Sequence, residues 1–189
     1  MTQYITIVSG LPRSGTSMMM QMLQASGMEV IVDNVRKADD DNPYGYYEYE
    51  KVKKIKEDSS FLDQAYGKAF KMVSMLLYEL PHDKQYKVIF MRRNTTEMIF
   101  SQKVMLQRSN NSVEEYNGEE MRKVIEKHLK QVIPWLEEQE NMDVIYVNYH
   151  EAIEHPLSSA HTINQFLGNR LDVRKMVAAI DQALYRNRA

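Results

Sequence analysis

The chain reads Gly-Leu-Pro-Arg-Ser-Gly-Thr-Ser at residues 10–17, directly after the apolar run Tyr-Ile-Thr-Ile-Val at residues 4–8. The apolar run predicts a β-strand, and residues 17–25 after the loop have the composition of a helix. Glycines at positions 10 and 15 permit the tight backbone geometry of a strand-to-helix turn. The N–H groups of such a turn and the dipole of the following helix favour an anion. We therefore expect residues 10–17 to form a phosphate-binding loop.

This loop departs from the nucleotide-binding P-loop at one position. The spacing of its two glycines fits that motif, but the motif then requires a lysine followed by serine or threonine. Thr16 stands in the lysine position, and the cation of the loop is Arg13. Arg13 can hold charged oxygens with several donors, and the hydroxyl groups of Ser14, Thr16 and Ser17 add further donors. The loop suits phosphate but lacks the usual group for the terminal phosphate of ATP.

Composition limits the classes of protein to which the chain can belong. Its 189 residues carry 24 basic and 26 acidic side chains, so bulk attraction to nucleic acid or to an anionic membrane is not expected. There is no cysteine to form disulfides or thiolate ligands, and no carboxylate pair has the context of a magnesium site. No signal peptide or membrane-spanning apolar run is evident. We expect one cytoplasmic domain over residues 1–189, without metal, as a monomer or homodimer.

Apolar, β-branched runs alternate along the chain with segments of helical spacing. Strands are expected at residues 4–8, 69–73, 86–91 and 144–147, with a weaker fifth run at 28–32. Helices are expected at 95–106, 118–140 and 156–167. The alternation predicts an α/β three-layer sandwich with a mostly parallel central sheet, of the P-loop nucleotide-binding type. Ligands of such folds bind at the carboxyl ends of the strands, where residues 10–17, 92–94 and Ser74 are expected to lie.

The loop and a second segment together resemble the nucleotide-binding motifs of sulfotransferases. Gly-x-Pro-Arg-Ser-Gly-Thr-Ser is similar to the loop that binds the 5′-phosphosulfate of 3′-phosphoadenylyl sulfate (PAPS), in which these enzymes carry Lys or Arg at the position of Arg13. Residues 86–94 look like the strand before the family's 3′-phosphate motif, an arginine followed eight positions later by a serine. Arg93 and Ser101 have this spacing. The resemblance implies PAPS as donor, 3′-phosphoadenosine 5′-phosphate (PAP) as product, and a donor site of Pro12, Arg13, Ser14, Gly15, Thr16, Ser17, Arg93 and Ser101.

The resemblance also implies catalytic residues, with one departure. Phe-Lys-Met-Val at residues 70–73 is similar to the family's Lys-Thr-His strand, so Lys71 is expected to contact the transferring sulfuryl group. Val73 replaces the histidine that serves as general base, and valine cannot accept a proton. Residues 42–48 resemble an Asn-Pro-x-Gly-aromatic-aromatic-Glu segment of small bacterial sulfotransferase-like proteins, which makes Glu48 the first candidate base. Behind it come three further acids, Asp40, Asp41 and Glu50.

The motifs together imply a sulfotransferase that moves a sulfuryl group from PAPS to a hydroxyl or amine. Arg13 and Lys71 would stabilise the charge that develops during the transfer. The acceptor, whether small molecule, carbohydrate or peptide, is not identified, but the unpatterned polar segments 33–47 and 107–117 are expected to shape its site. The Arg-Lys-Gly loop that covers the 3′-phosphate in cytosolic sulfotransferases has no counterpart. The candidates to replace it are Arg174, Arg186 and Arg188.

Two other hypotheses stay open at this point. An ATP-dependent kinase with a deviant P-loop would need a lysine for the terminal phosphate and an acid for magnesium, and Thr16 counts against it. A non-catalytic nucleotide-binding protein on the same fold would account for valine in place of the family's histidine. The sequence does not decide between transfer and binding alone.

Overall fold

The computed structural model describes residues 4–33, 35–108 and 117–184, and its centre is a four-stranded sheet with the order β2-β1-β3-β4. Every strand pair in this sheet is parallel, which confirms the expected α/β class. The strands are β1 (Ile5–Gly10), β2 (Ala69–Val73), β3 (Tyr86–Arg92) and β4 (Met142–Asn148). The central strand β1 is buried along its whole length, which is why it reads as a continuous apolar run.

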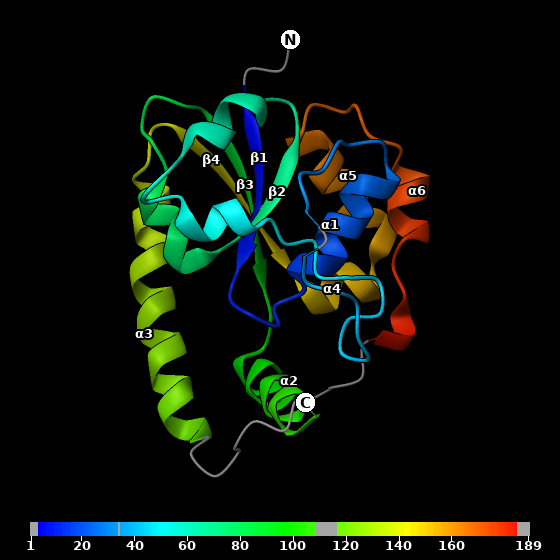
Figure 1. Ribbon diagram of the computed structural model, residues 1–189. Helices are drawn as coiled ribbons and strands as arrows, with labels where there is room; N and C mark the ends of the chain where they lie inside the picture. Colours follow the sequence, from blue (N-terminus) through cyan, green and yellow to red (C-terminus); the bar gives the residue numbers. More distant parts are fainter. Residues whose placement is uncertain (1–3, 34, 109–116, 185–189) are drawn as a thin grey trace.

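Helices cover both faces of the sheet and complete three layers, as the sequence predicts (Figure 1). One face carries α1 (Thr16–Ala25), α4 (Tyr149–Glu154), α5 (Pro156–Phe166) and α6 (Val173–Ala178). The other face carries α3 (Gly118–Glu137) and the 3-10 helices η1 (Glu50–Lys54), η2 (Ser60–Gln64) and η3 (Ser74–Glu79). Helix α2 (Thr95–Arg108) follows β3 beyond the carboxyl edge of the sheet, and the 3-10 helix η4 (Gln182–Leu184) lies near the C-terminus.

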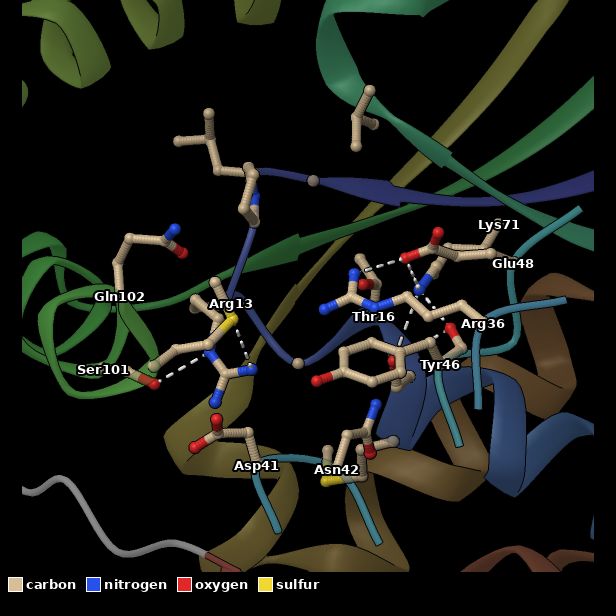
Figure 2. Close-up of a pocket in the computed structure, with 18 of the residues that line it drawn as sticks. Arg13, Thr16, Arg36, Asp41, Asn42, Tyr46, Glu48, Lys71, Ser101 and Gln102 are labelled. Carbon is tan, nitrogen blue, oxygen red and sulfur yellow. Dashed lines mark hydrogen bonds and ion pairs between the residues drawn. The ribbon is translucent and has the colours of Figure 1, made fainter. Parts of the chain in front are cut away.

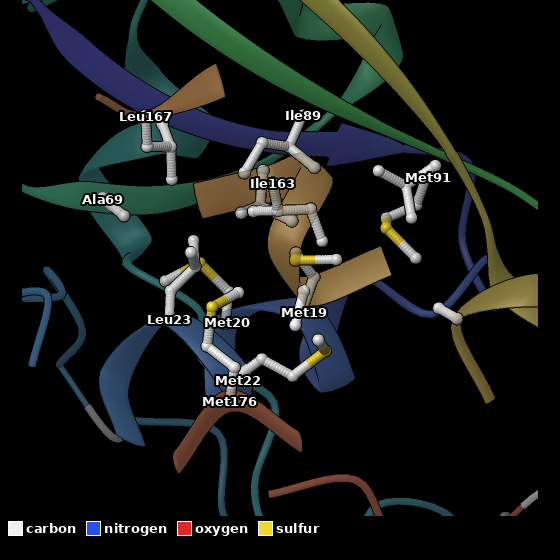
Figure 3. Close-up of a cluster of buried hydrophobic side chains, with 14 of the residues drawn as sticks. Met19, Met20, Met22, Leu23, Ala69, Ile89, Met91, Ile163, Leu167 and Met176 are labelled. Atoms are coloured by element: carbon white, nitrogen blue, oxygen red, sulfur yellow. The ribbon is translucent and has the colours of Figure 1, made fainter. Parts of the chain in front are cut away.

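Methionine and leucine side chains join α1 to the sheet. Met19, Met20, Met22 and Leu23 occupy one face of the helix and are fully buried. They pack with side chains of β3, α5 and α6, as Figure 3 shows. This packing fixes α1 against the strands, so the loop between β1 and α1 has a rigid element at each end.

One sequence expectation about the sheet is wrong. Residues 28–32 form a single bridge, Val30 to Ala69, in place of a fifth strand. The chain is polar from Asp33 onward and leaves the edge of β2, because further extension would not bury apolar side chains. Arg186, Arg188 and residues 109–116 of the polar segment 107–117 lie outside the described residues.

No helix within the described part of the chain is both long and apolar enough to span a bilayer.

Replacement of Leu23 by alanine should lower the free energy of unfolding by about 2–5 kcal/mol, because it leaves a cavity where α1 meets the sheet. Leu157→Ala is the matched control, since Leu157 is 55% exposed, and it should change stability by about 0.5 kcal/mol or less. Urea unfolding followed by circular dichroism measures both. Equal losses in the two variants would contradict this account of the core.

Candidate functional site

The carboxyl ends of β1, β2 and β3 converge on one cavity of about 470 Å³. Its wall contains the expected donor-site and catalytic residues except Ser14, so segments far apart in the chain meet at the predicted edge. Of the three further candidate acids, Asp41 belongs to the wall, whereas Asp40 and Glu50 do not. Figure 2 shows two groups of polar side chains in it. Arg13 and Ser101 lie on one side, and Lys71, Glu48, Arg36 and Tyr46 lie on the other.

The glycines of the loop are required by its own packing. Gly15 has a φ of +98° and is the N-cap of α1, with no side chain capping that helix end. A Cβ atom at Gly15 would lie 2.3 Å from the ring of Tyr149, and one at Gly10 would lie 2.6 Å from the Ser14 hydroxyl. The first-turn N–H groups of a helix have no intrahelical acceptors, so the N-terminus of α1 at the cavity is of the kind that suits an anion.

Two hydroxyl groups expected at this edge are engaged inside the fold. Ser14 is buried, and its hydroxyl donates to the carbonyl of Leu11 at 2.7 Å. This hydrogen bond closes the turn of the loop, so the hydroxyl of Ser14 stabilises the loop itself. Ser74 is buried as well, and its hydroxyl lies 2.8 Å from Nε2 of His128 on α3. Neither side chain belongs to the cavity wall.

Arg13 crosses the cavity edge towards α2. Its backbone is in the left-handed region with a φ of +68°, a conformation that is uncommon outside glycine. Its Nε donates to the hydroxyl of Ser101 at 2.9 Å, and its Nη1 lies 4.0 Å from the sulfur of Met105. The guanidinium is thus held against Ser101 and Met105 of α2.

Arg93 links the loop to β3 and α2. Its Nη1 donates to the carbonyl of Arg13 at 3.2 Å, and its Nε donates to the carboxylate of Glu97 at 2.8 Å. The side chains of Arg93 and Glu97 are 8% and 7% exposed, so this is a buried ion pair. The guanidinium also lies 4.5 Å from the ring centroid of Tyr149, the same ring that packs on Gly15. Arg93 therefore helps to hold the loop in place and also faces the cavity.

Lys71 approaches the cavity from β2, opposite Arg13. Its side chain is 11% exposed, and its ammonium group donates to the backbone carbonyl of Tyr46 and lies 3.4 Å from the hydroxyl of Ser17. Burial lowers the pKa of Lys71 to about 8, although the nearby Glu48 carboxylate opposes the shift. A buried ammonium at the cavity wall is well placed to bind an anion.

Glu48 is surrounded by three cations. Its carboxylate lies 3.0 Å from Arg36, 3.3 Å from Lys53 and 3.8 Å from Lys71. Burial alone would raise the pKa of Glu48, but these cations outweigh it and bring the pKa below its ordinary value. Glu48 is therefore ionised at neutral pH and able to accept a proton, although the ion pairs weaken it as a base.

Sequence reasoning missed several polar residues of the cavity wall, among them Arg36, Arg108 and Gln102. Arg36 pairs with Glu48 and stacks on the ring of Tyr46, with 3.3 Å from Cζ to the ring centroid. Arg108, at the end of α2, bridges to Asp41 at 2.6 Å. Gln102 places a side-chain amide on the wall beside Ser101. None of them belongs to a motif, so only the folded chain reveals them.

A family model for the sulfotransferase domain matches residues 5–188. The chain belongs to the sulfotransferase domain family. One similar solved structure is the "Sulfotransferase Domain from the Curacin Biosynthetic Pathway", with a TM-score of 0.55 and 14% identity. The match covers 94% of this chain and 78% of that one. At this identity the likeness shows a shared fold. A comparison with curated proteins gave no match.

Cationic side chains outnumber acidic ones in the wall of the cavity. Its wall includes six cationic side chains, Arg13, Arg36, Lys53, Lys71, Arg93 and Arg108. It includes three acidic side chains, Asp41, Glu48 and Asp181. Among the described residues no group of three or more His, Asp or Glu side chains is arranged to hold a metal ion.

Replacement of Glu97 by leucine should lower the free energy of unfolding by about 3–5 kcal/mol, because Arg93 is then a buried charge without its carboxylate. The double variant Arg93→Met/Glu97→Leu should lose less than the single variant, since no buried charge is left unpaired. Urea unfolding of the two single variants and the double variant forms the cycle. Additive losses would show that the two side chains do not act as a pair.

Proposed function

We propose that this sulfotransferase takes its sulfuryl group from PAPS and transfers it to a hydroxyl or amine. The observation that carries the proposal is the placement of Arg13 between Ser101 and Arg93 at one side of the cavity, with Lys71 at the other. A donor with two separated anionic ends needs a cation for each end, here Arg13 and Arg93, and a loop of backbone donors, with Lys71 opposite them for the sulfuryl group. The cavity offers both, with more cations than acids in its wall.

These contacts support the following donor site. The backbone of residues 13–17 and the Arg13 guanidinium would hold the 5′-phosphosulfate, and Arg93 and Ser101 would hold the 3′-phosphate. The 2.9 Å hydrogen bond between Arg13 and Ser101 joins the two sites, so each orients the other. The 470 Å³ cavity is of the size that small-molecule ligands occupy.

Bound PAPS supplies an electrophilic sulfur and a phosphate leaving group. Lys71 would stabilise the charge that grows on the oxygens around the sulfur, a role in which one donor is worth about 3–4 kcal/mol. Glu48 would take the proton of the acceptor. Because three cations weaken it as a base, proton transfer to Glu48 is favourable only late, when bond formation has made the acceptor oxygen more acidic.

Calorimetry with PAP and with ATP and magnesium tests the donor class. PAP should bind more tightly, since the loop has Thr16 where ATP-binding loops carry lysine. Arg13→Ala should weaken PAP binding by about tenfold or more, because a charge-assisted hydrogen bond is lost. Arg122→Ala on α3, outside the cavity wall, should leave it unchanged.

Three results would change this assignment. Tight binding of ATP with magnesium, without PAP binding, would favour a kinase. Unchanged PAP affinity in Arg13→Ala would remove the loop from the site. PAP binding without sulfuryl transfer to any acceptor in a broad screen would leave a nucleotide-binding protein without catalysis.

The affinity for PAPS in the absence of acceptor should fall as pH rises above about 8. The ammonium of Lys71 is charged below its pKa of about 8 and neutral above it, so its attraction for the donor is lost there. Calorimetric titrations between pH 7 and pH 9.5 measure this dependence. Lys71→Arg should bind PAPS with little change over the same range, because arginine keeps its charge. The same fall in Lys71→Arg would assign it to another group.

A further inference from the structure

One part of the cavity wall is apolar and is not used by the proposed donor site. It comes from three segments at the outer side of β2: the entry to η1, the end of β2, and η3. We call it the apolar wall. Its members with accessible side chains are Tyr49, Val73 and Leu76. Val52 and Met72 also line the cavity but belong to the core beneath the sheet and are only 4% and 1% exposed.

Val73, the member of the apolar wall at the end of β2, lies two residues beyond Lys71 on the same strand. Side chains alternate along a strand, so Lys71 and Val73 point to the same face of β2. Val73 pairs in register with Gly10, the first residue of the phosphate loop. It is 37% exposed, although valine is usually buried, and its exposed surface contributes to the cavity. An apolar surface therefore adjoins the place where the sulfuryl group would lie.

The charged groups next to the apolar wall are engaged with one another. Lys53 belongs to η1, and its ammonium lies 2.6 Å from Glu50 and 3.3 Å from Glu48. Glu48 in turn pairs with Arg36 and Lys71. A ligand against the apolar wall would thus meet neutralised pairs at its edge and aliphatic or aromatic carbon along its length.

On the basis of the proposed function, we propose that the acceptor is a neutral alcohol or phenol with an apolar body. The body would lie against the apolar wall, and the hydroxyl would lie at its border beside Glu48 and Lys71. Contact with the wall removes apolar surface from water on both sides, which favours such a body. A sugar would place hydroxyl groups against carbon without hydrogen-bond partners, which is unfavourable.

The transfer step balances with these groups. The acceptor oxygen forms a bond to sulfur, and the bond from sulfur to the 5′-phosphate oxygen breaks with its electron pair on that oxygen. The acceptor proton goes to the Glu48 carboxylate, and the products are a sulfate ester and PAP. Val73 and Leu76 take no part in bond making, so they are specificity-determining residues.

Binding of 4-alkylphenols to the PAP-saturated protein tests the inference without turnover. Each added methylene, from 4-methylphenol to 4-butylphenol, should tighten binding about three- to fourfold until the wall is covered. Glucose should show no binding over the same concentration range. Calorimetry or NMR titration measures both. An affinity independent of chain length, or glucose binding as tight as that of 4-butylphenol, would overturn the proposal.

Two substitutions assign the effect to the apolar wall. Val73→Thr keeps the side-chain shape and adds a hydroxyl, and Leu76→Gln adds an amide at similar size. Each should weaken 4-butylphenol binding about fivefold or more and leave PAP affinity unchanged. Val35→Thr is the control, since Val35 is exposed outside this cavity. Unchanged phenol affinity in both wall variants would overturn the inference.

Failure of the donor assignment is separable from failure of this inference. Absence of PAP binding in the wild type would remove the proposed function. The phenol series would then be measured on the free protein, where a chain-length dependence that is lost in Val73→Thr still supports an apolar ligand at this wall. A flat series there would overturn the acceptor class.

Discussion

The geometry of the site depends on the buried contacts of Arg93. Its guanidinium joins the end of β3, the first turn of α2 through Glu97, the backbone of the loop through the carbonyl of Arg13, and α4 through the ring of Tyr149. A guanidinium is planar and carries several N–H donors, so one side chain can make all of these contacts at once. The pair with Glu97 makes burial of the charge tolerable, because an unpaired buried guanidinium would cost several kcal/mol. The loop proposed to hold the donor is thus itself held in place by the Arg93–Glu97 ion pair.

The opposite side of the cavity is built differently. Lys71 projects from a strand, but the groups around it come mainly from the irregular segment 35–49, whose contacts are mostly polar. The carbonyl of Tyr46 accepts hydrogen bonds from Lys71 and Ser17, and its ring lies under Arg36. Its hydroxyl donates to Asp39, and burial raises the pKa of Tyr46 to about 12. These contacts anchor a segment that has little apolar surface to bury, and so they fix the position of Glu48.

The sequence predicts those parts of the protein that depend on local pattern. The four strands follow from apolar, β-branched runs, whereas residues 28–32 resemble such a run but lie at the edge of β2 and form one bridge. The spacing of Arg93 and Ser101 places both in the cavity wall because a strand end and the next helix fix their distance. Arg36 could not be predicted, because its position depends on how a segment without periodicity folds. Gln102 and Arg108 lie on α2, and the helical pattern does not indicate which of its side chains face the cavity. For Ser14 the residue type suggested a ligand donor, but its hydroxyl closes the loop.

Valine at position 73 has a consequence for how the proposed base is held. A histidine at position 73 would be positioned by β2, whose backbone pairs with β1. Glu48 lies outside the sheet and is oriented by Arg36, Lys53 and Lys71, so its position and its basicity depend on the same three charges. In the proposed reaction Lys71 would also face the sulfuryl oxygens, which would draw its charge away from Glu48 and raise the basicity of that carboxylate. Donor binding would in this way prepare the base, and the surface freed by the missing imidazole becomes part of the apolar wall.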